Sequence, residues 1–261
     1  MKKLMPRIIA LALTLCLCLG WSTAALADYD SKIDSVMSTF SRQNTYADSA
    51  YQQQANGAYR MVELLEIIAL EKGCSSTSVS SIMSSYSRQN TYADSAPQQV
   101  VNGTYRSVEL LELIALKLGC PSSSVSSIVS SFSRQNTYAD SAFQQSVNGA
   151  YRCVELLELI ALELGCSPSS VSSIMSSFSR QNTYAKSAHQ QLTNGTYRCV
   201  ELLELIVLKQ GCSSTSVSSI MSSFSRQNTY ADSALQQSVN GFYRCVELLE
   251  LLARKWDRFI L

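Results

Sequence analysis

The feature that most constrains this chain is an internal repeat with a fixed period. The motif Ser-Arg-Gln-Asn-Thr-Tyr-Ala occurs five times and begins at Ser41, Ser87, Ser133, Ser179 and Ser225. Each step is 46 residues, and most positions are identical between copies. Such a period is typical of arrays whose units cannot bury their apolar faces alone. The sequence therefore predicts one repeat domain over residues 28–261, with units at about 31–76, 77–122, 123–168, 169–214 and 215–261.

Each unit has the pattern of a helical hairpin. In the second copy the first helix has one apolar stripe at helical spacing, made by Val79, Ile82, Met83 and Tyr86. Serines fill most of the opposite face of this helix. The predicted fold class is all-α, an array of five helix hairpins of the α-solenoid type. The period lies in the range of HEAT and armadillo repeats, but the chain lacks tetratricopeptide and ankyrin signature residues.

The second helix of each unit has clear start and stop signals. It opens with Ser95, which is followed by Gln98 three residues later, the pattern of an N-terminal capping box. It ends at Gly119, a residue that favours helix C-termini. The weak point is Asn102-Gly103, because Gly costs about 1 kcal/mol relative to Ala inside a helix. One helix, kinked or straight, is the favoured interpretation, and a late start with a three-helix unit is the alternative.

The two ends of the array carry charge that the inner copies lack. Asp30, Lys32 and Asp34 add charge to the first helix, and residues 254–258 replace the apolar end of the last copy with a charged segment. Terminal units of an open array need polar outer faces. The sequence therefore predicts that both ends are solvent-exposed caps.

The first 27 residues have the pattern of a secretory signal peptide. A basic start, Met1-Lys2-Lys3, precedes an apolar run over residues 8–19 and the small-residue site Ala25-Leu26-Ala27. The apolar run is short for a membrane anchor. The short basic start resembles bacterial signals, so the prediction is a secreted, extracellular protein of bacterial type without a membrane span.

Composition excludes several classes of function. Lys plus Arg is 21 and Asp plus Glu is 20, so no excess of positive charge favours nucleic acid. With one His, neither a Ser-His-Asp triad nor a His-rich zinc site is expected. The ten glycines do not form a phosphate-binding loop. We expect no catalytic residue, no metal site and no cofactor.

The cysteines fall into two classes, one after the Gly that ends the second helix and one inside that helix. Counted through the turn, the second class is expected to lie level with the first across each junction. In an oxidising compartment this predicts three disulfides with 33-residue spacing, Cys120–Cys153, Cys166–Cys199 and Cys212–Cys245. The alternative is that all seven are small buried apolar residues.

Cys74 has no partner in this scheme, since Ser107 occupies the position of Cys153 one copy earlier. An odd thiol in a secreted protein indicates an intermolecular bridge. The corresponding prediction is a free thiol at Cys74 and a Cys74-linked homodimer.

One polar stripe of the second helix is a candidate binding face. Its residues share one side of the helix at spacings of three and four, and in the second copy they are Gln98, Asn102, Arg106, Glu109 and Glu112. Stacked units would repeat this stripe as a ladder for an extended ligand. The alternative is a solvated face that only keeps the array soluble.

Three further positions are expected to have no direct role in function. Tyr92 and Tyr105 recur in every copy and are expected to wedge the turn and the helix interface. His189 stands where other copies have Tyr51, Pro97, Phe143 and Leu235, which indicates a tolerant surface position without a role.

Together these observations favour a secreted, non-enzymatic repeat protein. It would bind a protein or another surface macromolecule, or form an extracellular scaffold. The alternative is a precursor or substrate whose copies are processed or cross-linked outside the cell.

Overall fold

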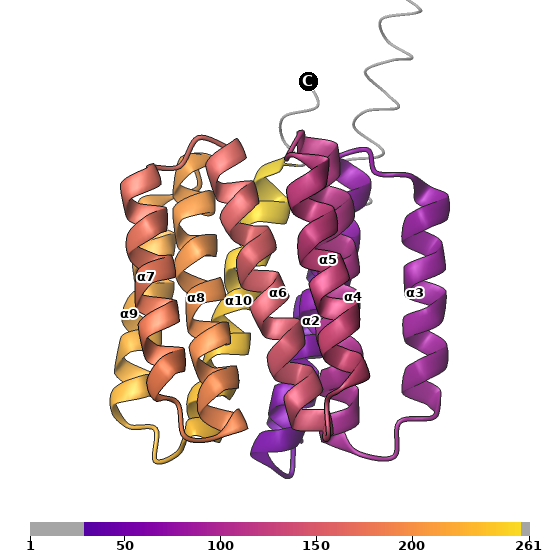
Figure 1. Ribbon diagram of the computed structural model, residues 1–261, viewed down its shortest axis with the longest axis vertical. Coiled ribbons are helices and arrows are strands. Elements are labelled where there is room, and N and C mark those ends of the chain that lie inside the picture. Colours follow the sequence, from indigo (N-terminus) through magenta and orange to yellow (C-terminus); the bar gives the residue numbers. More distant parts are fainter. Residues whose placement is uncertain (1–28, 257–261) are drawn as a thin grey trace, which may run out of the picture.

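The protein is built from two concentric layers of helices (Figure 1). The computed structural model describes residues 29–256, which contain helices and no strand. The inner layer consists of α2 (Ala50–Glu71), α4 (Ala96–Leu118), α6 (Ala142–Glu163), α8 (Ala188–Lys209) and α10 (Ala234–Trp256). The outer layer consists of the helical residues 29–45 with α3 (Ser76–Thr91), α5 (Ser122–Thr137), α7 (Pro168–Tyr184) and α9 (Ser214–Thr229). The all-α prediction is confirmed, while the proposed signal peptide at residues 1–27 lies outside the described residues.

The inner helices form a closed ring. Each inner helix packs against the next, and the last one, α10, packs against the first, α2. Aromatic pairs show the same continuity: Tyr105 of α4 contacts Phe132 of α5 at 4.6 Å between ring centroids. The corresponding pair across the closure is Phe40 with Tyr243, at 4.9 Å. The array is therefore a ring, and not the open solenoid that the sequence suggested.

The charged ends of the chain meet each other at this closure. The Arg254 guanidinium donates to Asp34 at 2.6 Å and also lies 3.4 Å from Asp30. The residues expected to be exposed caps thus pair the last inner helix with the first outer helix. Arg254 is half-buried and Asp34 is exposed, so these ion pairs add little to stability. Their main role is to orient α10 against the first outer helix.

The inner helices begin and end at the capping residues that the sequence predicts. Ser49, Ser95, Ser141 and Ser187 each accept a hydrogen bond from the backbone N–H three residues later, at the start of an inner helix. At the opposite end Gly119 has a φ of 98°, a left-handed conformation that a side chain would strain. The predicted caps are confirmed, and they fix where each inner helix turns outward.

The Asn-Gly pairs allow the inner helices to approach closely. A Cβ added to Gly103 would lie 2.8 Å from the Cβ of Ala58 on the preceding inner helix. The same approach recurs around the ring, and at the closure a Cβ on Gly57 would lie 2.7 Å from that of Phe242. The inner helix is continuous through Asn102-Gly103, as the favoured interpretation held. Gly is present there because a side chain would separate neighbouring helices.

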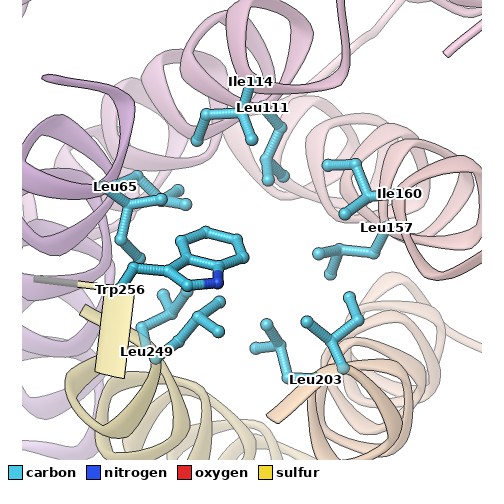
Figure 2. A pocket seen from close by; sticks show the side chains of 11 residues that line it. Leu65, Leu111, Ile114, Leu157, Ile160, Leu203, Leu249 and Trp256 are labelled. Carbon is cyan, nitrogen blue, oxygen red and sulfur yellow. The ribbon is translucent and has the colours of Figure 1, made fainter. Parts of the chain in front are cut away.

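An apolar column fills the axis of the ring. Figure 2 shows Leu65, Leu111, Leu157, Leu203 and Leu249, one from each inner helix, pointing toward a common centre. The remaining space at this level is a cavity of about 20 Å³ lined by apolar residues. Space of this size holds about one water, and the apolar lining offers it no polar partner. The ring therefore has a packed core and not an open channel.

Two bulky residues of the last copy close the axis. Trp256 stands among the leucines (Figure 2) and donates its indole N–H to Gln210 at 2.8 Å. The Lys72 ammonium lies 3.7 Å from the centroid of the Trp256 ring. Phe242 is buried at a position where the other copies have Ala or Thr. Five identical side chains cannot all occupy the one space at the axis of the ring. The larger residues Phe242 and Trp256 of the last copy fill that space.

The cysteines among residues 29–256 are all free thiols, and none of the three predicted bridges is present in the described structure. Cys120 and Cys166 follow the ends of α4 and α6, at one end of the ring. Cys153 lies 13 residues before Cys166, which corresponds to about 20 Å along a helix. The expected common level of the two classes is wrong, because the inner helix α6 continues to Glu163, well beyond Cys153.

The inner cysteines instead lie at the axis. Cys153, Cys199 and Cys245 line an apolar cavity of about 10 Å³ together with Met61 and Ser107. Burial raises the pKa of the Cys153 thiol to about 12. At neutral pH this group stays protonated, which makes it a poor nucleophile and a small apolar packing residue.

The close approach of the inner helices predicts the effect of Gly103→Ala. In an isolated helix this change would stabilise by about 1 kcal/mol. Here the added methyl group would meet Ala58, and overpacking costs about 1–3 kcal/mol. We expect a net loss in the free energy of unfolding, measured by urea titration. The control is Ser81→Ala on the exposed face of α3, which should be neutral or slightly stabilising; a gain from Gly103→Ala would contradict the packing.

The free thiols predict that reducing agent leaves the melting temperature unchanged. Calorimetry with and without dithiothreitol measures this. Peptide mapping without reduction should recover none of the three pairs with 33-residue spacing. Recovery of Cys120 linked to Cys153 would contradict the described positions of both residues.

Candidate binding site: polar pockets at one end of the ring

A polar hollow lies where an outer helix turns into the following inner helix. In the last copy its walls are Arg226, Gln227, Tyr230, Ala231, Gln236 and Asn240, and its volume is about 420 Å³. In the first copy the corresponding residues Arg42, Gln43, Tyr46, Ala47, Gln52 and Asn56 enclose about 350 Å³. We call such a hollow a turn pocket. The same residue types stand at the same spacing in the three middle copies.

An amide hydrogen bond ties the two walls of every turn pocket together. In the second copy Asn102 of α4 donates to the side-chain oxygen of Asn90 on α3 at 2.9 Å. The equivalent bond is present in all five copies, at 2.9 to 3.2 Å. In three copies the neighbouring Gln donates in turn to the inner Asn, as Gln98 does to Asn102. These amides hold the outer helix end at a fixed position over the inner helix.

The tyrosine of each motif contributes little to folding, because its side chain is exposed. The exposed fractions of Tyr46, Tyr92, Tyr138, Tyr184 and Tyr230 lie between 75 and 79%. Tyr184 is the last residue of α7, and the other four directly follow an outer helix. The turns that lead from each outer helix into the next inner helix lie at one end of the ring, and those that lead from inner to outer helices lie at the other (Figure 1). This corrects the expectation that Tyr92 wedges the turn. Tyr92 does not continue the apolar stripe of α3 at helical spacing, and this spacing is a sequence signal of an exposed side chain.

The charges around the turn pockets are mixed. Arg88 is exposed at the end of α3, and Asp94 is exposed two residues after the tyrosine. The same Arg recurs in every copy, and the Asp is replaced by Lys186 in the fourth. No carboxylate lines the turn pocket of the first copy or that of the last copy. The pocket interior therefore presents guanidinium, amide and phenol groups, with acidic groups outside.

The polar stripe predicted from the sequence is not one accessible face. Asn102 and Arg106 are buried, with exposed fractions of 6 and 8%, whereas Gln98, Glu109 and Glu112 are half-exposed. Arg106 pairs with Glu109 at 2.6 Å along the helix. The stripe is interrupted because the outer layer covers its middle. Its lower part, Gln98 and Asn102, occupies the positions that form the inner wall of the turn pockets.

Tyr105 and His189 also have defined surroundings. Tyr105 packs against Phe132 of the next outer helix, so the prediction of an interface residue is confirmed. His189 is half-buried against Phe143, 4.3 Å between ring centroids, and its Nε2 lies 3.5 Å from the Tyr51 hydroxyl. These side chains come from three inner helices. The variable position is thus an axial packing site, and not the tolerant surface site that its variation suggested.

Cys74, the proposed intermolecular thiol, is half-buried. Burial raises the pKa of this thiol, an effect that nearby Lys117 partly offsets. Within residues 29–256 no group of three or more His, Cys, Asp or Glu side chains is arranged to hold a metal ion. No helix of that segment is both long enough and apolar enough to cross a membrane.

Comparisons with protein-family models, curated proteins and solved structures gave no match for this chain.

The inner-layer glutamates predict higher stability at mildly acidic pH. Burial raises the pKa of Glu112, Glu158 and Glu204 in the folded state. Their protonated forms favour the fold, and this stability is lost as pH rises through the raised pKa values. We expect a higher melting temperature at pH 5 than at pH 7.5. Changing these three residues to Gln should flatten the dependence, while Asp94→Asn on the exposed turn should not.

Proposed function

We propose that the protein is a secreted, non-enzymatic binding protein that contacts another macromolecule through its turn pockets. In this proposal each of the five 46-residue units supplies one pocket. The observation that carries it is the ring of exposed tyrosines at one end of the molecule. Tyr is among the residues enriched at contact surfaces, because it combines a large apolar face with a hydroxyl group.

The arrangement suits binding through several weak contacts. Identical pockets on a rigid ring make each further contact intramolecular once the first has formed. The inter-wall amide bonds support this role, since a preorganised pocket loses less entropy on binding. Export, as proposed from residues 1–27, would place the ring at a cell surface or in the medium.

A cross-linked or processed scaffold is the second candidate. The exposed tyrosines, and the exposed glutamines such as Gln89, would be accessible to enzymes that couple such side chains. Mass spectrometry of the native secreted material distinguishes the two. An intact, unmodified chain 28–261 supports the binder, and cross-linked tyrosine or glutamine, or fragments of one unit, support the scaffold or precursor.

The test of the binding proposal removes pockets one at a time. Tyr→Ala variants at one, two, three, four and five turns are compared with Ser→Ala at the exposed positions Ser35, Ser81, Ser127, Ser173 and Ser219. Retention on extracellular material of the producer is measured by surface plasmon resonance. We expect the dissociation rate to rise at least tenfold by the third removed pocket, because avidity is lost. Equal retention of the five-pocket variant and the serine control would refute the role of the pockets.

The Cys74-linked homodimer remains a prediction. A dimer would double the number of pockets that one particle presents. Because Cys74 is half-buried, the bridge requires that the end of α2 admits a second thiol. A non-reducing gel of the wild type and Cys74→Ser tests it: a reducible dimer lost in the variant supports the bridge, and a monomeric wild type excludes it.

A further inference from the structure

The chemistry of the turn pockets indicates which ligand they fit. The pocket of the last copy, about 420 Å³, has the size of small-ligand sites and is open to solvent at the turn. Its walls combine one aromatic side chain, Tyr230, with the planar polar groups of Arg226, Gln227, Gln236 and Asn240. The methyl group of Ala231 is the main aliphatic part of this lining.

Sugar rings match this lining group by group. One face of a sugar ring carries C–H groups that stack on an aromatic face, where close contact gains dispersion energy. Its edge carries hydroxyl groups that both donate and accept hydrogen bonds. Side-chain amides also donate and accept, whereas a guanidinium only donates. Tyr230 can supply the stacking face, and Gln227 of α9 and Gln236 of α10 can supply amides.

The same lining is less suited to peptides and to nucleic acid. Protein partners are anchored mainly by Trp, Tyr and Arg side chains seated in desolvated pockets, whereas the turn pocket is open to solvent and has mostly polar walls. Single-stranded nucleic acid requires aromatic platforms within a continuous basic groove. Here the exposed Asp232 stands two residues after Tyr230, and an Asp occupies that position in four of the five copies.

The number and placement of the pockets indicate a repeating ligand. The chain carries the pocket residues five times, and the turns that carry the exposed tyrosines lie at one end of the ring (Figure 1). A surface coated with polysaccharide presents one sugar unit many times, which several identical sites can engage together. A folded protein partner would have to present five equivalent surfaces.

We infer that each turn pocket binds one or two sugar units of a repeating glycan, and that the ring attaches end-on, with its tyrosine end facing the glycan surface. This inference rests on the proposed binding function and names its ligand class. A single pocket is expected to bind weakly, and attachment is expected to depend on several pockets at once.

The test uses the full mature chain on immobilised polysaccharides of defined composition, namely glucans, mannans, galactans, chitin and glycan strands of bacterial cell wall. Two variants are matched to it: all five tyrosines to Ala, and all five to Phe. Both should keep the wild-type melting temperature, because the side chains are exposed. The Ala variant should lose at least 100-fold in apparent affinity, and the Phe variant, which keeps the stacking face, should stay within about fivefold of the wild type. The matching free monosaccharide at millimolar concentration should compete.

Three results would overturn the inference. Retention on protein-coated but not on polysaccharide surfaces would show that the binding function stands and the glycan does not. Retention on neither surface, nor on extracellular material of the producer, would contradict both the binding function and the glycan ligand. Glycan binding that survives the Ala variant would place the glycan elsewhere on the ring.

Discussion

The close contact between neighbouring inner helices is the constraint on which the rest of the structure depends. Each inner helix carries a Gly where the preceding helix approaches, and a Cβ added there would lie 2.5 to 3.0 Å from the nearest side-chain atom. Gly in a helix costs about 1 kcal/mol, so five such positions are unfavourable for isolated helices. They become favourable only when neighbours pack against them. This short spacing lets five helices close around an axis that leucines can fill.

Closure gives the two layers different roles. The inner layer supplies the core, with leucines at the axis and the single bulky residues Phe242 and Trp256 completing the packing. The outer helices bury only a narrow stripe, and in α3 the fully buried residues are Val79 and Tyr86. Their remaining surface is largely Ser, and the tyrosine motif at their ends faces solvent. The exposed tyrosines of the candidate site therefore take no part in the core. Hydrogen bonds between side-chain amides, such as that from the buried Asn102 to Asn90, hold the turn that carries them.

Local features of the fold could be predicted from the sequence, and its closure could not. The Ser caps, the Gly ends and the continuous inner helix depend on a few neighbouring residues, and each was found from spacing alone. The sequence predicts that Asp34 and Arg254 are terminal charges, and it gives no sign of their pairing, which joins residues 220 positions apart. The relative height of the two cysteine classes also depends on long-range structure, because it is set by how far the inner helix extends past Cys153.

At the axis, the sequence differences at the position of His189 are typical of an exposed site. They instead reflect the packing of different side chains into one space at the centre of the ring. For the candidate site, Gln98 and Asn102 of the predicted polar stripe belong to the inner wall of a turn pocket. The exposure of the tyrosines depends on the path of the turn, which local spacing alone does not determine.

The closed ring can be tested most directly at the pair that joins its ends. In Arg254→Lys, a carbodiimide should form a zero-length amide between residue 254 and Asp34, whose partners lie 2.6 Å apart in the wild type. Glu250, one helical turn from residue 254 and 3.0 Å from the Arg254 guanidinium, serves as an internal control. Tandem mass spectrometry of the monomer fraction identifies both links. A closed ring predicts the link to Asp34 together with the link to Glu250. Formation of the Glu250 link alone would show that α10 does not reach the first outer helix, and the ring would be an open array.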